Sequence, residues 1–148
     1  MIKYPILAID YGEKHFGLAY SDSKGLIATP LEVLHLTKRK TLENIVLEIL
    51  EIANEYRIQT LLLGKPQIFE KQQEQTIKKI STFEDILKKH TTLPILTTDE
   101  SFSTTEAQNM LLSTGQNTKS TRGKIDKISA TVFLQEFLNS NNQKNGSI

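Results

Sequence analysis

Apolar residues follow strand-like patterns in the first quarter of the chain. Residues 4–10 form an almost continuous apolar run, and residues 15–22 alternate between large apolar and small or polar side chains. These patterns are typical of a buried and a half-buried strand. Residues 22–25 have turn chemistry and a third strand-like segment follows at 26–36, so the three segments predict an antiparallel meander. Pro30 cannot donate to a ladder, which favours an edge strand or a bulge at that point.

The apolar pattern changes to a helical period in the middle of the chain. Apolar residues recur every three or four positions in 42–56 and again in 70–89, which predicts two amphipathic helices. A short apolar run follows each helix, at 60–66 and at 93–100, and predicts a buried strand. Strands that alternate with helices indicate parallel strands joined by right-handed crossovers. The expected fold is therefore α/β: a mixed five-stranded sheet, with a three-strand antiparallel meander and two parallel strands, flanked by helices.

The C-terminal third is more polar. The segment 103–106 has the Ser-x-x-Glu spacing of a capping box, which predicts the start of a third helix. Residues 115–124 are polar and loop-like, and a last helix is expected over about 124–138. We expect one domain over 1–139 and a disordered tail over 140–148, because the tail has almost no apolar residues.

Composition narrows the function classes only slightly. The 148 residues are 38% hydrophobic and 24% charged, and the net charge of +1 does not by itself indicate a nucleic-acid binder. The chain has no cysteine, which excludes a disulfide framework and a thiolate zinc site. The N-terminal apolar run is too short for a signal peptide and no segment has the length of a membrane span, so we expect a cytoplasmic protein without a membrane partner.

Acidic residues stand at the ends of elements that the predicted sheet brings to one edge. Asp10 ends the first strand, Asp99 and Glu100 end the fifth, and Asp126 falls in the first turn of the expected last helix, where small residues at 129–130 allow close approach to the sheet. Crowded carboxylates repel one another, and a hard divalent cation relieves that repulsion. The pattern predicts a site for Mg²⁺ or Mn²⁺, with one or two ions and with substrate phosphate as a further ligand, suited to phosphodiester hydrolysis.

Each acid also has a simpler interpretation. Asp10 precedes a turn residue and can be a turn former, whereas Asp99 and Glu100 can be solvated loop acids. Asp126 can act only on the helix macrodipole, as acids near a helix N-terminus do. The coincidence of three acidic segments favours the metal site over these separate interpretations.

Basic residues close to the acids are candidates for binding nucleic acid. Lys119, Arg122 and Lys124 precede Asp126 without an intervening acid, and Lys65 falls on the same predicted edge; their alternative is a solvated loop. Gly12 has no Cβ and would let the backbone approach a metal ion or a phosphate. The scattered histidines are expected to have structural roles (His15, His35, His90).

Four segments, in order, resemble the YqgF family of Holliday-junction-resolvase-like and pre-16S rRNA nucleases. They are "IDYGEKHFGLAYSD", "LLLGKP", "TTDESFSTTEA" and "RGKIDKISATVFLQEFL", and together they span nearly the whole chain. The resemblance implies a ribonuclease-H-like fold, metal-dependent nuclease activity, and a role in ribosome biogenesis that acts on small-subunit precursors by maturing the 5′ end of 16S rRNA. It places acidic site residues at Asp10, at Asp126 and at the Asp99–Glu100 pair, with Glu100 preferred.

The chain departs from the family pattern at three positions. Ser101 and His15 stand where the family usually has arginine, and Lys65 stands where it usually has an apolar residue. Junction resolvases of this fold carry an acid at the end of the fourth strand, and this chain has none there, which favours RNA over branched DNA as substrate. Two other hypotheses are an actin-like ATP-binding module, which would need a second domain, and a non-catalytic ribosome-assembly factor that binds nucleic acid.

Overall fold

The computed structural model describes residues 2–12, 14–65, 74–99 and 118–146. They form a five-stranded sheet with strand order β3-β2-β1-β4-β5. The strands are β1 (Ile6–Tyr11), β2 (His15–Ser21), β3 (Ala28–His35), β4 (Thr60–Lys65) and β5 (Ile95–Asp99).

The sheet is mixed, as the sequence predicts. β2 pairs antiparallel with both β1 and β3, whereas β4 pairs parallel with both β1 and β5. Pro30 lies on the edge strand β3, and the β2–β3 register shifts between Gly17 and Ala19, so that β3 carries one extra residue next to Pro30. Both parts of the expectation for Pro30, an edge position and a bulge, are confirmed.

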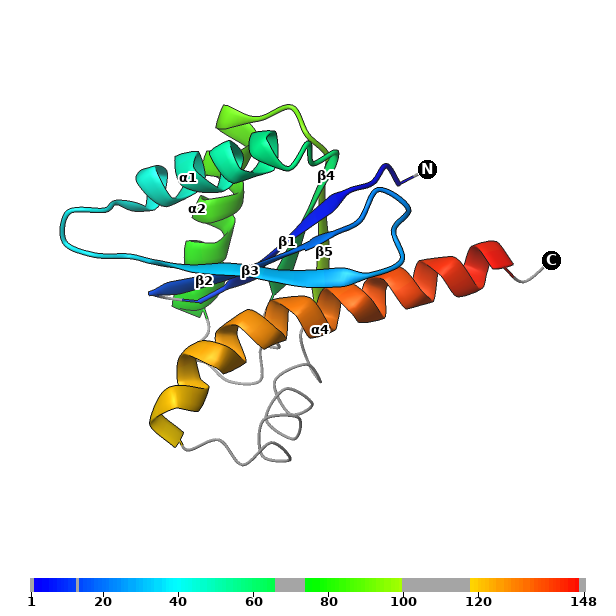
Figure 1. Cartoon of the computed structure of the whole chain (residues 1–148). Coiled ribbons are helices and arrows are strands. Elements are labelled where there is room, and N and C mark those ends of the chain that lie inside the picture. The colour runs from blue at the N-terminus through cyan, green and yellow to red at the C-terminus, as the bar shows by residue number, and fades with distance from the viewer. Residues whose placement is uncertain (1, 13, 66–73, 100–117, 147–148) are drawn as a thin grey trace.

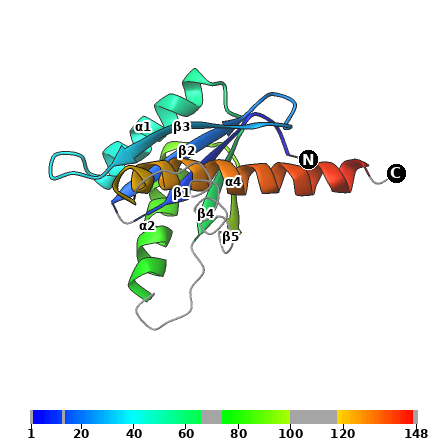
Figure 2. The same ribbon diagram turned by 60° about the horizontal axis from the view of Figure 1, so that its bottom comes forward.

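Helices cover both faces of the sheet (Figure 1). On one face lie α1 (Leu42–Glu55) and α2 (Glu74–His90), the two amphipathic helices expected from the apolar period. Thr41 caps α1, because its Oγ1 accepts from the Asn44 N–H at 3.2 Å. The long helix α4 (Thr118–Gly146) crosses the other face, as the turned view in Figure 2 makes clear.

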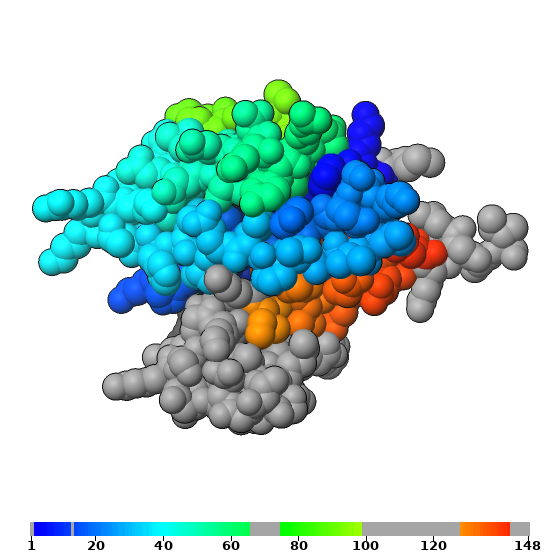
Figure 3. Space-filling view, viewed as in Figure 1, coloured from blue at the N-terminus to red at the C-terminus, as the bar shows by residue number. Residues whose placement is uncertain are grey.

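Each face has its own core because side chains along a strand alternate. Leu7, Ile9 and Tyr11 of β1 point toward α1 and α2, whereas Ile6 and Ala8 point toward α4. The α4 side of the core includes Ala8, Ala19 and Ala130, small residues that let the helix lie close to the strands; its larger members are Ile6, Leu62, Phe133, Leu134 and Leu138. The space-filling view shows α4, in orange and red, lying along the surface of β2 and β3 (Figure 3).

α4 is longer at both ends than the sequence predicts. It begins at Thr118, so residues 118–124 are helical and not the expected loop, and it continues to Gly146 through most of the expected disordered tail. Polar side chains of α4 hold its C-terminal half against residues 25–28, in the turn after β2 and at the start of β3. Asn142 Nδ2 donates to the Gly25 carbonyl at 3.0 Å, and the Gln135 side chain both accepts from the Ala28 N–H and donates to the Leu26 carbonyl at 2.9 Å.

Other expectations fall outside the described residues. These are the capping-box helix start at 103–106, the first turn of the expected second helix and the last two residues of the chain. None of the helices in the described part of the chain combines the length and the apolar composition needed to cross a bilayer.

Candidate active site

Asp10 is the fifth residue of the central strand β1 and is partly buried. Its direct partners in the sheet are Gly17 on β2 and Gly64 on β4. Neither partner has a side chain, so the sheet surface on both sides of Asp10 is free of strand side chains. At this level of the sheet the two strands beside Asp10 therefore contribute only their backbone, and both glycines are buried.

Gly17 and Gly64 are site features that sequence reasoning missed. Gly25 is the only described glycine with a positive φ, so Gly17 and Gly64 have backbone conformations that other residues also adopt. Their lack of a side chain is therefore not needed for the backbone itself. Glycine inside a strand often marks close approach of a ligand or another backbone, and that signal was present in the sequence.

Strand alternation places Asp10 on the face that α4 covers. Ile6 and Ala8, two and four residues earlier, belong to the α4 side of the core. β1 and β4 are parallel, and Asp10 and Gly64 lie next to the C-terminal ends of these strands. Ligands of α/β proteins usually bind at this edge of the sheet.

Position 126 of α4 shares a helix face with residues that pack on the sheet. Ser129 and Ala130, three and four residues later, are buried, and so is Phe133, one turn further. Positions that repeat at three, four and seven share one face of a helix. Because α4 begins at Thr118, Asp126 is not in the first turn, and the alternative of a purely macrodipole role is wrong.

The acids at the end of β5 are only partly within the described residues. Asp99 is the last residue of β5 and stands opposite Lys65 in the parallel ladder; Glu100 lies outside the described residues. In the described part of the chain, no three His, Cys, Asp or Glu side chains are grouped closely enough to hold a metal ion. The structure thus defines Asp10 and the helix position of Asp126, and the joint carboxylate site stays a prediction.

Lys65 is not on the face of Asp10. Its Nζ lies 2.6 Å from Glu84 Oε1, and Glu84 belongs to α2 on the opposite face of the sheet. The Glu84 side chain is only 15% exposed, and Lys88 Nζ also approaches it at 3.7 Å. In the structure Lys65 therefore balances a partly buried carboxylate, and is not directed toward the face where a substrate would meet Asp10.

Gly12 has a structural explanation. A Cβ added at this position would lie 2.5 Å from the carbonyl oxygen of His15, so the tight connection from β1 to β2 requires glycine. Contact with a metal ion or a phosphate is not needed to account for it. The other predicted nucleic-acid contacts, Lys119, Arg122 and Lys124, lie in the first turns of α4, and their side chains are outside the described set.

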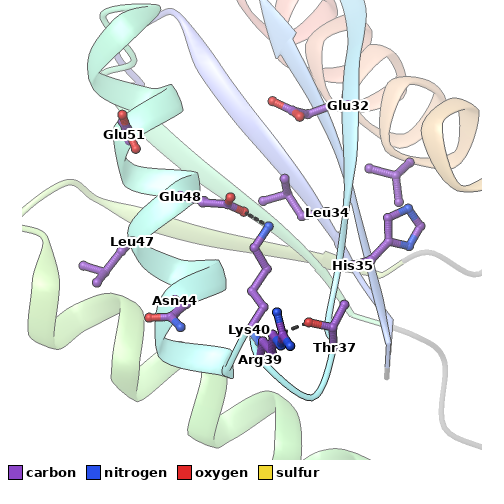
Figure 4. Close-up of a pocket in the computed structure, with 11 residues that line it drawn as sticks. Glu32, Leu34, His35, Thr37, Arg39, Lys40, Asn44, Leu47, Glu48 and Glu51 are labelled. Atoms are coloured by element: carbon purple, nitrogen blue, oxygen red, sulfur yellow. Dashed lines mark hydrogen bonds and ion pairs between the residues drawn. The ribbon is translucent and has the colours of Figure 1, made fainter.

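A separate cavity lies on the other side of the sheet. It has a volume of about 730 Å³ and opens between the edge strand β3 and α1 (Figure 4). Lys40 and Glu48 pair in it, with Nζ and Oε2 2.7 Å apart, and its wall also carries Glu32, Arg39 and Glu51. These charges of both signs are on the α1 side of the sheet, away from the face of Asp10, so the cavity does not belong to the candidate site.

The chain is similar to known proteins over most of its length. The family model described as "RuvX: Holliday junction resolvase" matches residues 4–140. A protein of Desulforudis audaxviator named "Putative pre-16S rRNA nuclease" is 32% identical over 135 residues, which cover 91% of this chain and 94% of the relative. A protein of the same name from Halothermothrix orenii is 32% identical over 141 residues, covering 95% and 99%.

Two solved structures share the fold. T. thermophilus RuvC in complex with a Holliday junction substrate superposes with a TM-score of 0.59 and 16% identity, covering 94% of this chain and 96% of the other. The fowlpox virus resolvase bound to Holliday junction DNA gives a TM-score of 0.55 and 15% identity, covering 93% and 98%. At these identities the likeness establishes the resolvase-type, ribonuclease-H-like fold alone, and it confirms the fold expected from the sequence.

Proposed function

This chain belongs to the RuvX/YqgF family of Holliday-junction-resolvase-like proteins, and from that premise we propose that it is a metal-dependent nuclease. Its substrate is the 5′ precursor segment of 16S rRNA, and it acts in the cytoplasm during small-subunit maturation. The observation that carries the proposal is the setting of Asp10, a partly buried acid between two glycines on a central strand. A carboxylate in such a setting can reach a metal ion and a phosphate at once.

The residues at this edge fit a hard divalent ion. Asp10 supplies a carboxylate with no strand side chain directly beside it, and carboxylate oxygens are the ligands that Mg²⁺ and Mn²⁺ prefer. Asp10 and Asp126 would hold it together with Glu100, whereas Asp99 shares its register position with Lys65, which faces α2. Bound there, the ion would supply Lewis acidity to the phosphodiester. The protein itself holds the carboxylates in place and attracts the substrate with the basic residues of α4.

RNA is the favoured substrate over a four-way DNA junction. The two relatives at 32% identity carry a name that refers to pre-16S rRNA, whereas the two solved resolvases are similar only in fold. The end of β4 has no carboxylate, because Gly64 stands beside Asp10 and Lys65 is directed to Glu84. Junction resolvases of this fold carry an acid at that strand end. Junction cleavage is the second candidate, supported by the description of the family.

The test compares two substrates under matched metal and salt. A pre-16S rRNA fragment that includes the 5′ precursor and a mobile four-way DNA junction are incubated with the protein in Mg²⁺ or Mn²⁺, and with Asp10→Asn as the control. We expect cleavage of the RNA that depends on the metal and on Asp10. Symmetric nicking of the junction with intact RNA would favour the resolvase alternative. Binding without cleavage of either substrate would favour a non-catalytic assembly factor.

A further inference from the structure

Two histidines face each other across the β2–β3 pair at the edge of the sheet. His15 and His35 are direct partners in the antiparallel ladder, and both side chains are exposed. Their Nδ1 atoms lie 2.7 Å apart, with ring centroids 4.7 Å apart and ring planes at 83°. The Nδ1 atoms of two histidines on neighbouring strands therefore lie close enough together to contact the same atom or ion.

The fold does not account for this arrangement. Neither ring belongs to the apolar core on either face, and a hydrogen bond between exposed groups adds little net stability. Within the described part of the chain, the hydrogen bond and the ring contact to the other histidine are the polar and aromatic interactions that each ring makes. The third histidine differs, because His90 Nε2 lies 3.0 Å from Glu43 Oε1 and forms an ordinary surface pair.

We propose that His15 and His35 form a binding site for one divalent transition-metal ion of the class that prefers imidazole, with Zn²⁺ as the test ion. Zinc–nitrogen bonds of about 2.0–2.1 Å at a tetrahedral angle place two ligand nitrogens roughly 3.3 Å apart. The observed separation of 2.7 Å is close to that value, and exposed side chains on fixed strands can widen it by small rotations. Water completes the coordination.

The protonation states also suit a metal ion. In the metal-free pair one Nδ1 carries the hydrogen and the other accepts it. Both rings bind a metal as neutral imidazoles, and the hydrogen of the first ring then moves from Nδ1 to Nε2.

The site is chemically distinct from the carboxylate site. Imidazole favours zinc, copper and nickel, whereas Mg²⁺ prefers oxygen ligands. His15 lies two residues before Gly17, which pairs with Asp10, so strand alternation places it on the same face of the sheet as Asp10. Figure 4 shows His35 directed away from α1, in agreement with this face. The inference goes beyond the nuclease proposal and does not depend on it.

The experiment is a calorimetric titration of the full, tag-free chain with Zn²⁺ in excess Mg²⁺, which occupies oxygen sites. We expect one equivalent to bind, and at least tenfold weaker binding in His15→Asn and in His35→Asn. His90→Asn is the matched control and should bind like the wild type. Asp10→Asn should also bind like the wild type, which separates this site from the nuclease site.

A second measurement uses the wild-type chain alone, so that it does not depend on the folding of any variant. Nitrogen-15 NMR of the histidine rings should show Zn²⁺-induced shifts at Nδ1 of two residues, and no shift for the third. No binding at millimolar Zn²⁺ would refute the proposal. Equal affinity in His15→Asn and the wild type would refute it too, as would loss of binding in Asp10→Asn.

Discussion

Asp10 on β1 and Gly64 on β4 are direct partners in the parallel ladder. Gly64 has no positive φ, so a substitution there tests the space beside the carboxylate and not the backbone conformation. Gly64→Val should therefore reduce metal-dependent cleavage at least tenfold, while Gly64→Ala should give an intermediate loss. The measurement is initial cleavage rate at saturating Mn²⁺.

Overpacking by itself costs stability, typically about 1–3 kcal/mol, so the thermal midpoint of each variant must be measured alongside the rate. The rates are compared at a temperature where every variant is folded. Full activity in a folded Gly64→Val protein would mean that the space beside Asp10 has no part in catalysis.

Asp10→Asn should keep the fold and lose activity. Asparagine has nearly the same shape, but it removes the negative charge that a divalent ion needs. Since metal assistance is worth several kcal/mol, we expect a fall in rate of about 100-fold or more. Millimolar Mn²⁺ should raise the melting temperature of the wild type more than that of the variant, because ligands that bind the native state stabilise it by mass action.

The strands of the sheet could be predicted because each strand has a recognisable pattern of apolar residues within its own segment. The run that ends at Asp10 and the alternation in β2 are local patterns, and Pro30 marked the edge strand correctly. Register, in contrast, is a relation between distant segments. The pairing of Asp10 with two glycines depends on it, and single-sequence patterns do not contain it.

The length of α4 and the partner of Lys65 were not predicted for the same physical reason. Polar contacts between distant segments do not produce a periodic pattern of apolar residues in the sequence. α4 extends to Gly146 with help from Asn142, whose amide reaches the Gly25 carbonyl of the β2–β3 turn. The same limit applies to Lys65, whose place on the predicted edge of the sheet indicated a nucleic-acid contact and gave no sign of an ion pair. Its partner Glu84 is far along the chain and lies on the opposite face from Asp10.

Lys65→Met should affect stability more than RNA binding. The substitution leaves the partly buried Glu84 carboxylate with only the more distant Lys88, and we expect a loss of up to about 1 kcal/mol in unfolding free energy. RNA affinity should stay within about twofold of the wild type. Glu84→Gln is the matched control, because it removes the other member of the pair. A large loss of RNA affinity in Lys65→Met alone would restore Lys65 as a substrate contact.

The turn between β2 and β3 should contribute stability that depends on pH. Asp22 Oδ1 accepts from the Leu26 N–H at 2.7 Å and from the Ile27 N–H at 3.0 Å, and these bonds, the one to Ile27 foremost, lower the pKa of Asp22. A pKa that is lower in the folded than in the unfolded state means stability that is present above the unfolded value, about 3.9, and is lost as pH falls through the folded value.

Asp22→Ala should therefore lower unfolding free energy at pH 7 by about 0.5–1 kcal/mol, as the loss of a capping acceptor does. The difference from the wild type should shrink below about pH 4. Urea unfolding at a series of pH values measures it, with Asp85→Ala, an exposed acid on α2, as the control. A difference that stays constant down to pH 2 would show that the charge of Asp22 is not involved.

Arg122 and Lys124 should contribute unequally to RNA binding, because both are in α4 rather than in a loop. At about 100° per residue, Arg122 falls roughly 40° from Asp126 around the helix, whereas Lys124 falls roughly 160° away. The side of α4 that contains Asp126 also contains the buried Ala130 and Phe133, so it is the side nearest the sheet. If the RNA follows the side of α4 that carries position 126, position 122 lies on its path and position 124 does not.

Arg122→Ala and Lys124→Ala each remove one positive charge from the same part of α4. Any difference between their RNA affinities therefore reflects the position of the charge and not the net charge of the protein. Each phosphate contact on a single strand contributes about −0.7 to the slope of log affinity against log salt. We expect Arg122→Ala to flatten the slope by about that amount and Lys124→Ala to flatten it by less than half as much. Fluorescence anisotropy with labelled RNA in Ca²⁺, at a series of salt concentrations, gives both slopes. Equal effects would indicate a general electrostatic attraction without a defined path along α4, and a larger effect of Lys124 would place the RNA on the side of the helix away from Asp10.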